Sequence, residues 1–168
     1  MDKVIDQWAS ERPDIDTRPF AIVGRIGRAG HLLDAAVEAK LEPHGLSRWS
    51  WDVLTALRRS GPPHRLTPTV LYRSLMRTSG AISNRLKRLE EQGLVRRVPD
   101  PTDGRGVLVE LTPGGKRLVD GVIAGHLENE RRLLAGLNLA EQRELAGLLR
   151  KLLIGLEPSD GPGATPSA

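Results

Sequence analysis

Apolar residues recur every three or four positions along most of the chain, which is the spacing of one face of an α-helix. Two shorter runs, LVRRVP and VLVEL, flank the turn-forming segment DPTDGRG and indicate two strands joined by a tight turn. We therefore predict a mainly α-helical fold with a small β-hairpin. The helices are predicted to begin near residues 4, 19, 47, 68, 79, 112 and 139.

Capping residues support several of these helix boundaries. Thr67 can cap a helix that has Pro68 at its first position. Asn138 and Glu141 have the spacing of a capping box at the start of the last helix. Two short helices separated by a break near Thr78, and followed by a hairpin, predict a winged helix-turn-helix.

The helix that begins near Ser79 is amphipathic, with an apolar stripe formed by Ile82, Leu86 and Leu89. The second helix of a helix-turn-helix lies in the major groove, where Ser, Asn, Lys and Arg can contact bases or phosphates. The alternative is a polar face that is merely solvated. With two threonines from the preceding helix, the candidate DNA-contacting residues are Thr67, Thr69, Ser79, Gly80, Ser83, Asn84, Lys87 and Arg88.

The tip of the hairpin adds two further candidates for DNA binding. Arg105 can project beyond the edge of the domain into the narrow, electronegative minor groove. Asp103 lies two residues earlier and can accept hydrogen bonds that fix the direction of this arginine. The alternative is an ordinary polar turn.

The distribution of charge favours a polyanionic partner for the middle of the chain. The net charge is +4, but residues 58–105 contain eleven Lys and Arg against four Asp and Glu. This basic segment lies between acidic ends, which is typical of binding to nucleic acid, although a solvated surface can also produce such a skew.

Other features of the sequence exclude several classes of function. The chain has no cysteine, which excludes disulfides, thiolate zinc sites and cysteine nucleophiles. The four histidines are scattered without the spacing of metal ligands, so we expect neither a metal site, nor a cofactor, nor an enzyme. No apolar run approaches a membrane span and the N-terminus lacks a signal-peptide pattern, so we expect a cytoplasmic protein, held at the nucleoid by DNA.

The segment from about Leu46 to Leu156 resembles the MarR family of bacterial transcription regulators. The resemblance is most specific in the pattern DPxDxRxxxVxLTxxG around the wing. It implies a homodimer with intertwined terminal helices, in which each subunit presents one winged helix-turn-helix to a pseudo-palindromic operator. Gly104 stands where the family often has another arginine.

This resemblance divides the chain into four parts. Residues 1–45 are expected to hold an added helix and a dimerisation helix, and residues 46–111 the DNA-binding lobe. Residues 112–157 are expected to form the C-terminal dimerisation helices, and residues 158–168 a disordered tail.

The N-terminal segment QWASERPDIDTRPFAIVGRIGR resembles the extension of the urate-responsive subgroup of that family. The resemblance implies a ligand pocket formed by Trp8, Asp52, Arg85 and Arg97, with Arg96 as a competitor for the last position. Arg85 flanks the apolar stripe of its helix, so it points back toward the protein, and its planar fork of donors suits a planar anion. The alternative is that Asp52 forms a structural ion pair with Arg85 or Arg97, while Trp8 simply packs.

Together these observations predict a ligand-responsive DNA-binding regulator, most simply a repressor that urate or a similar small planar anion releases from DNA. The alternative is a ligand-independent DNA-binding or chromatin-associated protein.

Overall fold

The helices form where sequence periodicity and capping residues coincide. The computed structural model describes residues 2–75, 82–103 and 106–157. Of the predicted features, Ser79, Gly80, Gly104, Arg105 and the tail at 158–168 lie outside these residues. The elements are α1 (Asp2–Glu11), α2 (Arg18–Leu41), η1 (Glu42–His44), α3 (Arg48–Arg59), β1 (Arg65–Leu66), α4 (Pro68–Ser74), α5 (Ile82–Glu91), β2 (Val95–Pro99), β3 (Val107–Leu111), α6 (Pro113–Leu133) and α7 (Leu139–Leu156).

The predicted caps are present. The hydroxyl of Thr67 accepts a hydrogen bond from the Val70 amide at 3.1 Å, with Pro68 at the first position of α4. Asn138 and Glu141 form the reciprocal capping box of α7. The predicted mainly helical fold with a small β-sheet is confirmed.

The sheet contains one strand that the sequence did not reveal. Its order is β1-β3-β2, and both pairings are antiparallel. The predicted hairpin is formed by β2 and β3, while β1 pairs Arg65 with Glu110 and Leu66 with Val109 on the other side of β3. A two-residue strand is too short to show alternation of polar and apolar positions, so only the tertiary structure identifies it.

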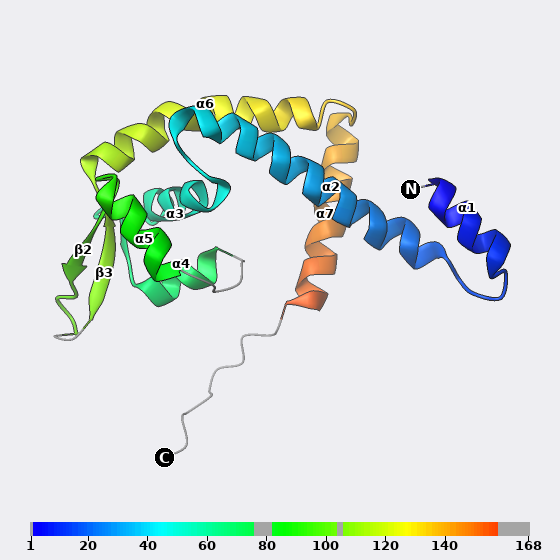
Figure 1. The fold of residues 1–168 in the computed structure, drawn as a ribbon, viewed down its shortest axis with the longest axis horizontal. Helices are drawn as coiled ribbons and strands as arrows, with labels where there is room; N and C mark the ends of the chain where they lie inside the picture. Colours follow the sequence, from blue (N-terminus) through cyan, green and yellow to red (C-terminus); the bar gives the residue numbers. More distant parts are fainter. Residues whose placement is uncertain (1, 76–81, 104–105, 158–168) are drawn as a thin grey trace, which may run out of the picture. The chain divides into compact units, whose positions relative to one another are not determined.

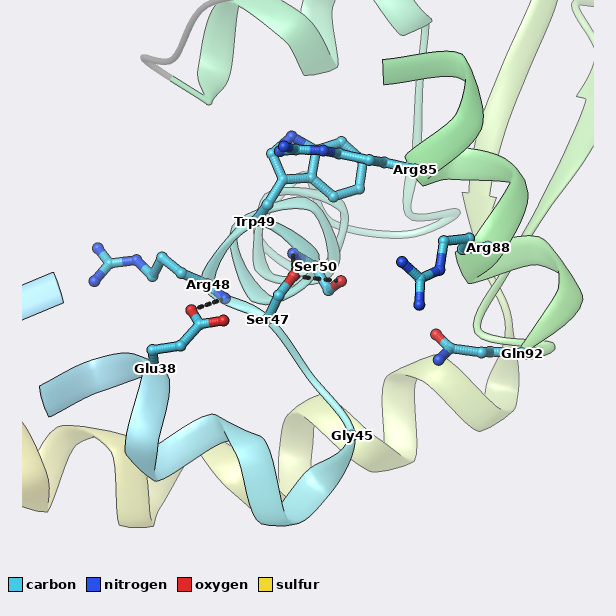
Figure 2. Close-up of a pocket in the computed structure, with 9 residues that line it drawn as sticks. All are labelled: Glu38, Gly45, Ser47, Arg48, Trp49, Ser50, Arg85, Arg88 and Gln92. Carbon is cyan, nitrogen blue, oxygen red and sulfur yellow. Dashed lines mark hydrogen bonds between the residues drawn. The ribbon is translucent and has the colours of Figure 1, made fainter. Parts of the chain in front are cut away.

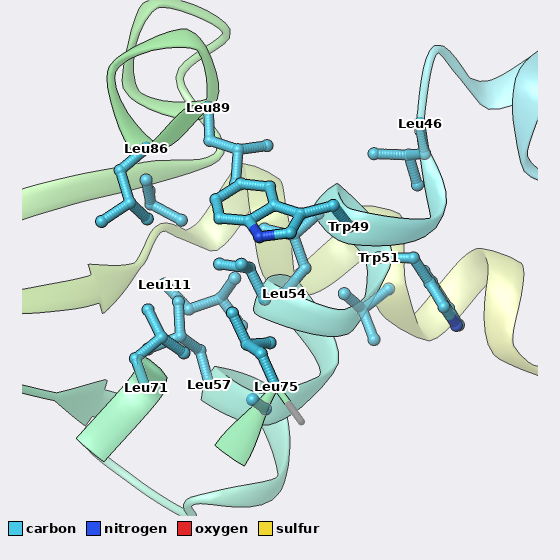
Figure 3. Close-up of a cluster of buried hydrophobic side chains, with 14 of the residues drawn as sticks. Leu46, Trp49, Trp51, Leu54, Leu57, Leu71, Leu75, Leu86, Leu89 and Leu111 are labelled. Carbon is cyan, nitrogen blue, oxygen red and sulfur yellow. The ribbon is translucent and has the colours of Figure 1, made fainter. Parts of the chain in front are cut away.

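The hydrophobic core of the lobe is built around α3 (Figure 3). Leu54 and Leu57 of this helix are fully buried. Leu71 of α4 and Leu89 of α5 pack against the same cluster, as do the apolar side chains of β3 and the first part of α6. The position of α5 is therefore fixed by the burial of its inner stripe, which leaves the opposite face outside.

The long helices outside this core carry exposed apolar residues. In α2 only Val37 and Leu41 are buried, while Ile22 is 60% and Val23 68% exposed. The helix α7 lies within a second compact unit, residues 131–168, and no residue of α7, all of which is described, is buried. None of the helices in the described part of the chain is long and apolar enough to cross a membrane.

The start of α6 is packed closely against the turn between α5 and β2. Thr112 donates its hydroxyl to the carbonyls of Gly93 and Leu94, at 2.7 and 3.1 Å. A Cβ atom added at Gly115 would overlap the carbonyl oxygen of Leu94 and lie 2.8 Å from Cδ1 of Leu111. This contact therefore requires glycine.

We expect Gly115→Ala to lower the free energy of unfolding by about 1–3 kcal/mol, because the added methyl group must displace backbone. Gly121→Ala, in the same helix, is the matched control, since a Cβ there meets nothing within 4 Å. The control should be neutral or more stable, by roughly 0.5–1 kcal/mol, because alanine favours helix. Chemical denaturation of both variants measures the difference, and equal stabilities would contradict the close contact.

Candidate functional site

The helix-turn-helix presents a polar outer face on α5. Leu86 and Leu89 point into the core, whereas Asn84, Lys87 and Arg88 are exposed. Lys87 keeps a loose contact with Glu91, at 3.8 Å between Nζ and Oε1, and its side chain is largely solvated. In the preceding helix Thr69 is exposed, while the hydroxyl of Thr67 is occupied by its capping bond. The backbone of Ser83 belongs to α5, but its side chain lies outside the described residues.

The wing is formed by β2, β3 and the turn between them. The side chain of Asp100 accepts hydrogen bonds from the amide and hydroxyl of Thr102, at 2.9 and 2.7 Å, which lowers the pKa of Asp100. The carbonyl of Asp103 accepts from the Gly106 amide at 2.8 Å, and the Asp103 side chain is exposed. These bonds organise the described part of the turn between β2 and β3.

Three charged side chains cross the sheet in one row. Glu110 on the central strand is bonded to Arg65 of β1 and Arg96 of β2, which are its register partners on either side. The Glu110 side chain is only 7% exposed, whereas that of Arg96 is 59% exposed. Burial acts to raise the pKa of Glu110, but hydrogen bonds and charge from the two arginines outweigh it, so the pKa is lowered overall. The row ties the wing to the segment that leads into α4.

A cavity of about 410 Å³ opens beside the inner edge of α5 (Figure 2). It lies between the C-terminal end of α2, the N-terminal end of α3 and α5. The Arg85 guanidinium lies over the ring of Trp49, 5.5 Å from its centroid, and Arg88 points into the same space. The lining residues are Glu38, Gly45, Ser47, Arg48, Trp49, Ser50, Arg85, Arg88 and Gln92.

The charges of this cavity are mixed but mainly positive. Arg48, Arg85 and Arg88 face one carboxylate, Glu38, whose Oε2 accepts a hydrogen bond from the Arg48 amide at 2.6 Å. A guanidinium that stacks through its face keeps the N–H donors at its edge for an anion. The cavity can therefore hold a small planar anion against α5.

The four side chains of the predicted ligand pocket do not meet in one cavity. Asp52 pairs with Arg48 at 3.2 Å and lines a second cavity of about 410 Å³ between α3 and α6. Trp8 stacks on Phe20, with 6.1 Å between ring centroids.

Arg97 lies near Glu90, with 3.8 Å between its Nε and the carboxylate, and its amide donates to the same carboxylate at 3.1 Å. Of the four, only Arg85 lines the cavity beside α5. Arg96, the alternative to Arg97, donates a hydrogen bond to Glu110 and does not line this cavity.

The sequence analysis did not predict that Arg88 and Trp49 line the cavity beside α5. Arg88 follows Arg85 by three residues, so both reach the same side of α5, a spacing that could have been noticed. Trp49 comes from another helix, and its contact with Arg85 required the fold. Within residues 2–75, 82–103 and 106–157 no three His, Cys, Asp or Glu side chains cluster as metal ligands.

Comparison with known proteins identifies relatives over most of the chain. Residues 44–106 match the family model described as MarR family. The regulator PecS of Dickeya dadantii is 35% identical over 149 residues, which cover 89% of this chain and 90% of that protein. The multiple antibiotic resistance protein MarR of Escherichia coli is 32% identical, over 76% of this chain and 90% of its own.

Solved structures agree with these relatives. A MarR family transcriptional regulator from Streptomyces coelicolor, in complex with DNA, is similar with a TM-score of 0.78 and 26% identity, covering 88% of this chain and 93% of that one. A mutant MarR from E. coli complexed with operator DNA has a TM-score of 0.71 and 30% identity, covering 80% and 96% of the two chains. These proteins are transcription regulators, which confirms the expectation that the chain is not an enzyme.

We expect Glu110→Gln to destabilise the protein by about 1–3 kcal/mol, because the two guanidinium groups lose the shared negative charge and one of its two acceptor oxygens. Asp120→Asn is the matched control: Asp120 also lies between two cations, Arg58 and Lys116, but is more exposed, so its loss should cost less. Thermal unfolding of both variants at neutral pH measures the difference.

The pH dependence of stability distinguishes these variants further. Because the folded-state pKa of Glu110 is lowered, its contribution is present above the unfolded-state pKa and lost as pH falls through the folded-state value. The stability of the wild type should therefore fall more steeply on acidification than that of Glu110→Gln. Parallel pH profiles would contradict the role of this row.

Proposed function

Because the chain belongs to the MarR family of DNA-binding transcription regulators, we propose that it is a homodimeric repressor released from its operator by urate or a similar small planar anion. The observation that carries this proposal is the position of Arg85. It belongs to α5, which we propose as the recognition helix, yet its guanidinium lies over the ring of Trp49 in a cavity between that helix and its scaffold. A molecule bound there contacts the same helix that contacts DNA.

DNA binding uses the outer face of α5 and the wing. Asn84 and Lys87 face away from the core and read base edges in the major groove, with Ser83 near the N-terminal end of the same helix. Ser79 and Gly80, which lie outside the described residues, belong to the same proposed set of contacts. Thr67 and Thr69 approach the phosphate backbone from the start of α4, while Arg105 enters the minor groove beside Asp103.

A dimer would explain why the terminal helices leave so much apolar surface uncovered. Leu148 and Leu153 of α7 are exposed, as are Ile22 and Val23 of α2. Exposed apolar residues gathered along a helix are typical of an interaction site. Two recognition helices related by a two-fold axis read half-sites about one helical turn apart, roughly 10 bp.

Release follows from competition between two states of the lobe. A ligand shifts a conformational equilibrium only when it binds one state better than the other. An anion held by Arg85 and Arg88 draws α5 toward α3 and changes the spacing of the two recognition helices in the dimer. Ligand and DNA then oppose each other, with a coupling free energy of about 1–3 kcal/mol.

The contacts seen at Asp52 and Trp8 also suit a regulator without a ligand. Asp52 has an ion-pair partner in Arg48, and Trp8 packs on Phe20, so each has a structural role. A ligand-independent DNA-binding protein is therefore the second candidate, and it predicts that no small anion changes DNA affinity.

The first test is a titration of the DNA complex with urate, using the DNA upstream of the protein's own gene. Urate should release wild-type protein, and Arg85→Ala should keep most of its DNA affinity while losing the response, because it lacks the stacked guanidinium. Trp8→Phe should blunt the response. Arg117→Ala, which removes an exposed cation of α6, is the control and should respond as the wild type does. If millimolar urate does not release the wild type from DNA, urate is not the effector. If urate releases Arg85→Ala as it releases the wild type, the effector does not bind in the cavity beside α5.

The second test concerns sequence readout. Lys87→Ala and Asn84→Ala should each lower discrimination between the upstream DNA and a scrambled duplex, by about 1–3 kcal/mol for a lost base contact. Arg105→Ala should weaken binding chiefly at the minor groove. Fluorescence anisotropy at several salt concentrations separates these effects, because a lost phosphate contact reduces the salt dependence of binding. Unchanged affinity and preference in all three variants would remove α5 from the interface.

A further inference from the structure

The wing is connected to the start of α4 by one buried carboxylate. Glu110 lies on the central strand β3, and its side chain is only 7% exposed. Its carboxylate accepts hydrogen bonds from Arg65 of β1 and from Arg96 of β2, the latter at 2.7 Å from Nε. Strand β1 ends directly before Thr67, the residue that caps α4. The row therefore joins the hairpin to the helix-turn-helix through side chains, in addition to the backbone pairing of the strands.

The next arginine of β2 makes a contact with α5. Because successive side chains of a strand point to opposite faces of the sheet, Arg97 lies on the face opposite that of Arg96. Its Nε is 3.8 Å from the carboxylate of Glu90 on α5, and its amide donates to the same carboxylate at 3.1 Å. The hairpin is thus held to the entrance of α4 through Glu110 and to α5 through Glu90.

The direction of the hairpin depends on these contacts near its base. A two-stranded hairpin is at best marginally stable by itself. Strands β2 and β3 pair over five positions, from Val95 opposite Leu111 at the base to Pro99 opposite Val107. The charged row crosses at the second of these pairs, counted from the base. A change of angle at that point is carried along the rest of the hairpin toward the DNA.

The negative charge of Glu110 distinguishes a positioning role from a direct role in binding DNA. A carboxylate near a bound duplex repels the phosphates, and it reduces the positive potential of the two arginines that contact it. By electrostatics alone, removal of this charge strengthens binding to DNA. If the carboxylate holds the wing in place, its removal weakens binding instead.

We propose that Glu110 is a positioning residue for DNA binding, which fixes the direction of the wing relative to α4 and α5 through Arg65 and Arg96. Buried between the two guanidinium groups, its carboxylate does not contact DNA itself. The inference rests on the proposed contact of the wing with the minor groove. Arg105, the residue proposed for that contact, lies outside the described residues.

The first experiment compares two variants that each lose one negative charge. Fluorescence anisotropy measures the affinity of Glu110→Gln and Asp120→Asn for the upstream DNA, at a temperature where thermal unfolding shows both variants fully folded. Asp120 also pairs with two cations, but it lies in α6, outside the wing. We expect Asp120→Asn to bind DNA as the wild type does or slightly more tightly, and Glu110→Gln to bind about three- to tenfold more weakly. Equal or tighter binding by Glu110→Gln overturns the proposal.

A double-mutant cycle tests whether the effect acts through the wing. In the Arg105→Ala background, Glu110→Gln should change affinity by less than about twofold, because a wing without its groove contact gains nothing from alignment. In the Lys87→Ala background it should keep its full effect, since Lys87 belongs to the outer face of α5. The same fold-loss in both backgrounds overturns the positioning role.

Arg65→Gln provides an independent measurement, and it replaces Glu110→Gln if that chain does not fold. As part of the row, Arg65 should affect affinity only while Arg105 is present. As a direct phosphate contact, its loss weakens binding in both backgrounds and reduces the slope of log affinity against log salt by about one. That second result overturns the proposal.

The outcomes also separate this inference from the proposed function. If Arg105→Ala alone leaves DNA affinity unchanged, the proposed wing contact is wrong, and the positioning role fails with it. If Arg105→Ala weakens binding but Glu110→Gln and Arg65→Gln act equally with and without Arg105, only the positioning role fails.

Discussion

Burial of α3 is the constraint on which the lobe depends. Its apolar side chains are packed on several sides at once, by α2, α4, α5, β3 and α6, so the helix serves as a common internal support (Figure 3). The outer face of α5 and the cavity beside Arg85 are both placed by contact with it. The recognition helix presents its polar face because Leu86 and Leu89 are held by this core, and the cavity beside Arg85 exists because Trp49 extends from the first turn of α3.

Local signals in the sequence predicted most of the elements, whereas long-range contacts could not be predicted. Caps such as Thr67 and the Asn138–Glu141 pair depend on residues three positions apart and were identified correctly. The angle of Arg85 beside the apolar stripe predicted that it points back toward the protein; its guanidinium lies over a neighbouring ring, although the residue as a whole is exposed. Its partner Trp49 lies 36 positions earlier, and nothing in either segment alone specifies their contact.

The expected ligand pocket is a second case in which long-range contacts could not be predicted from the sequence. A family resemblance matched four residue types, but it does not fix which of them meet within one chain. The structure holds Asp52 to Arg48, Arg97 near Glu90, and Trp8 against Phe20, each through a neighbour that is close in sequence or in the adjoining element. Local electrostatics also reduces the basic character of the middle segment, because Glu110 neutralises part of the charge on Arg65 and Arg96. The charge available to DNA is therefore smaller than a count along the sequence indicates.

The close approach at Gly115 has a mechanical consequence. Thr112 and Gly115 hold the first turn of α6 in close contact with the turn between α5 and β2. An α-helix resists bending over a few turns, and residues 113–130 extend about 27 Å from this joint. The helix therefore acts as a lever: a rotation of a few degrees at its distal end becomes a displacement of the wing and α5 as one rigid body. In the proposed dimer, release of DNA then needs only a small change of angle between subunits, without any refolding of the lobe.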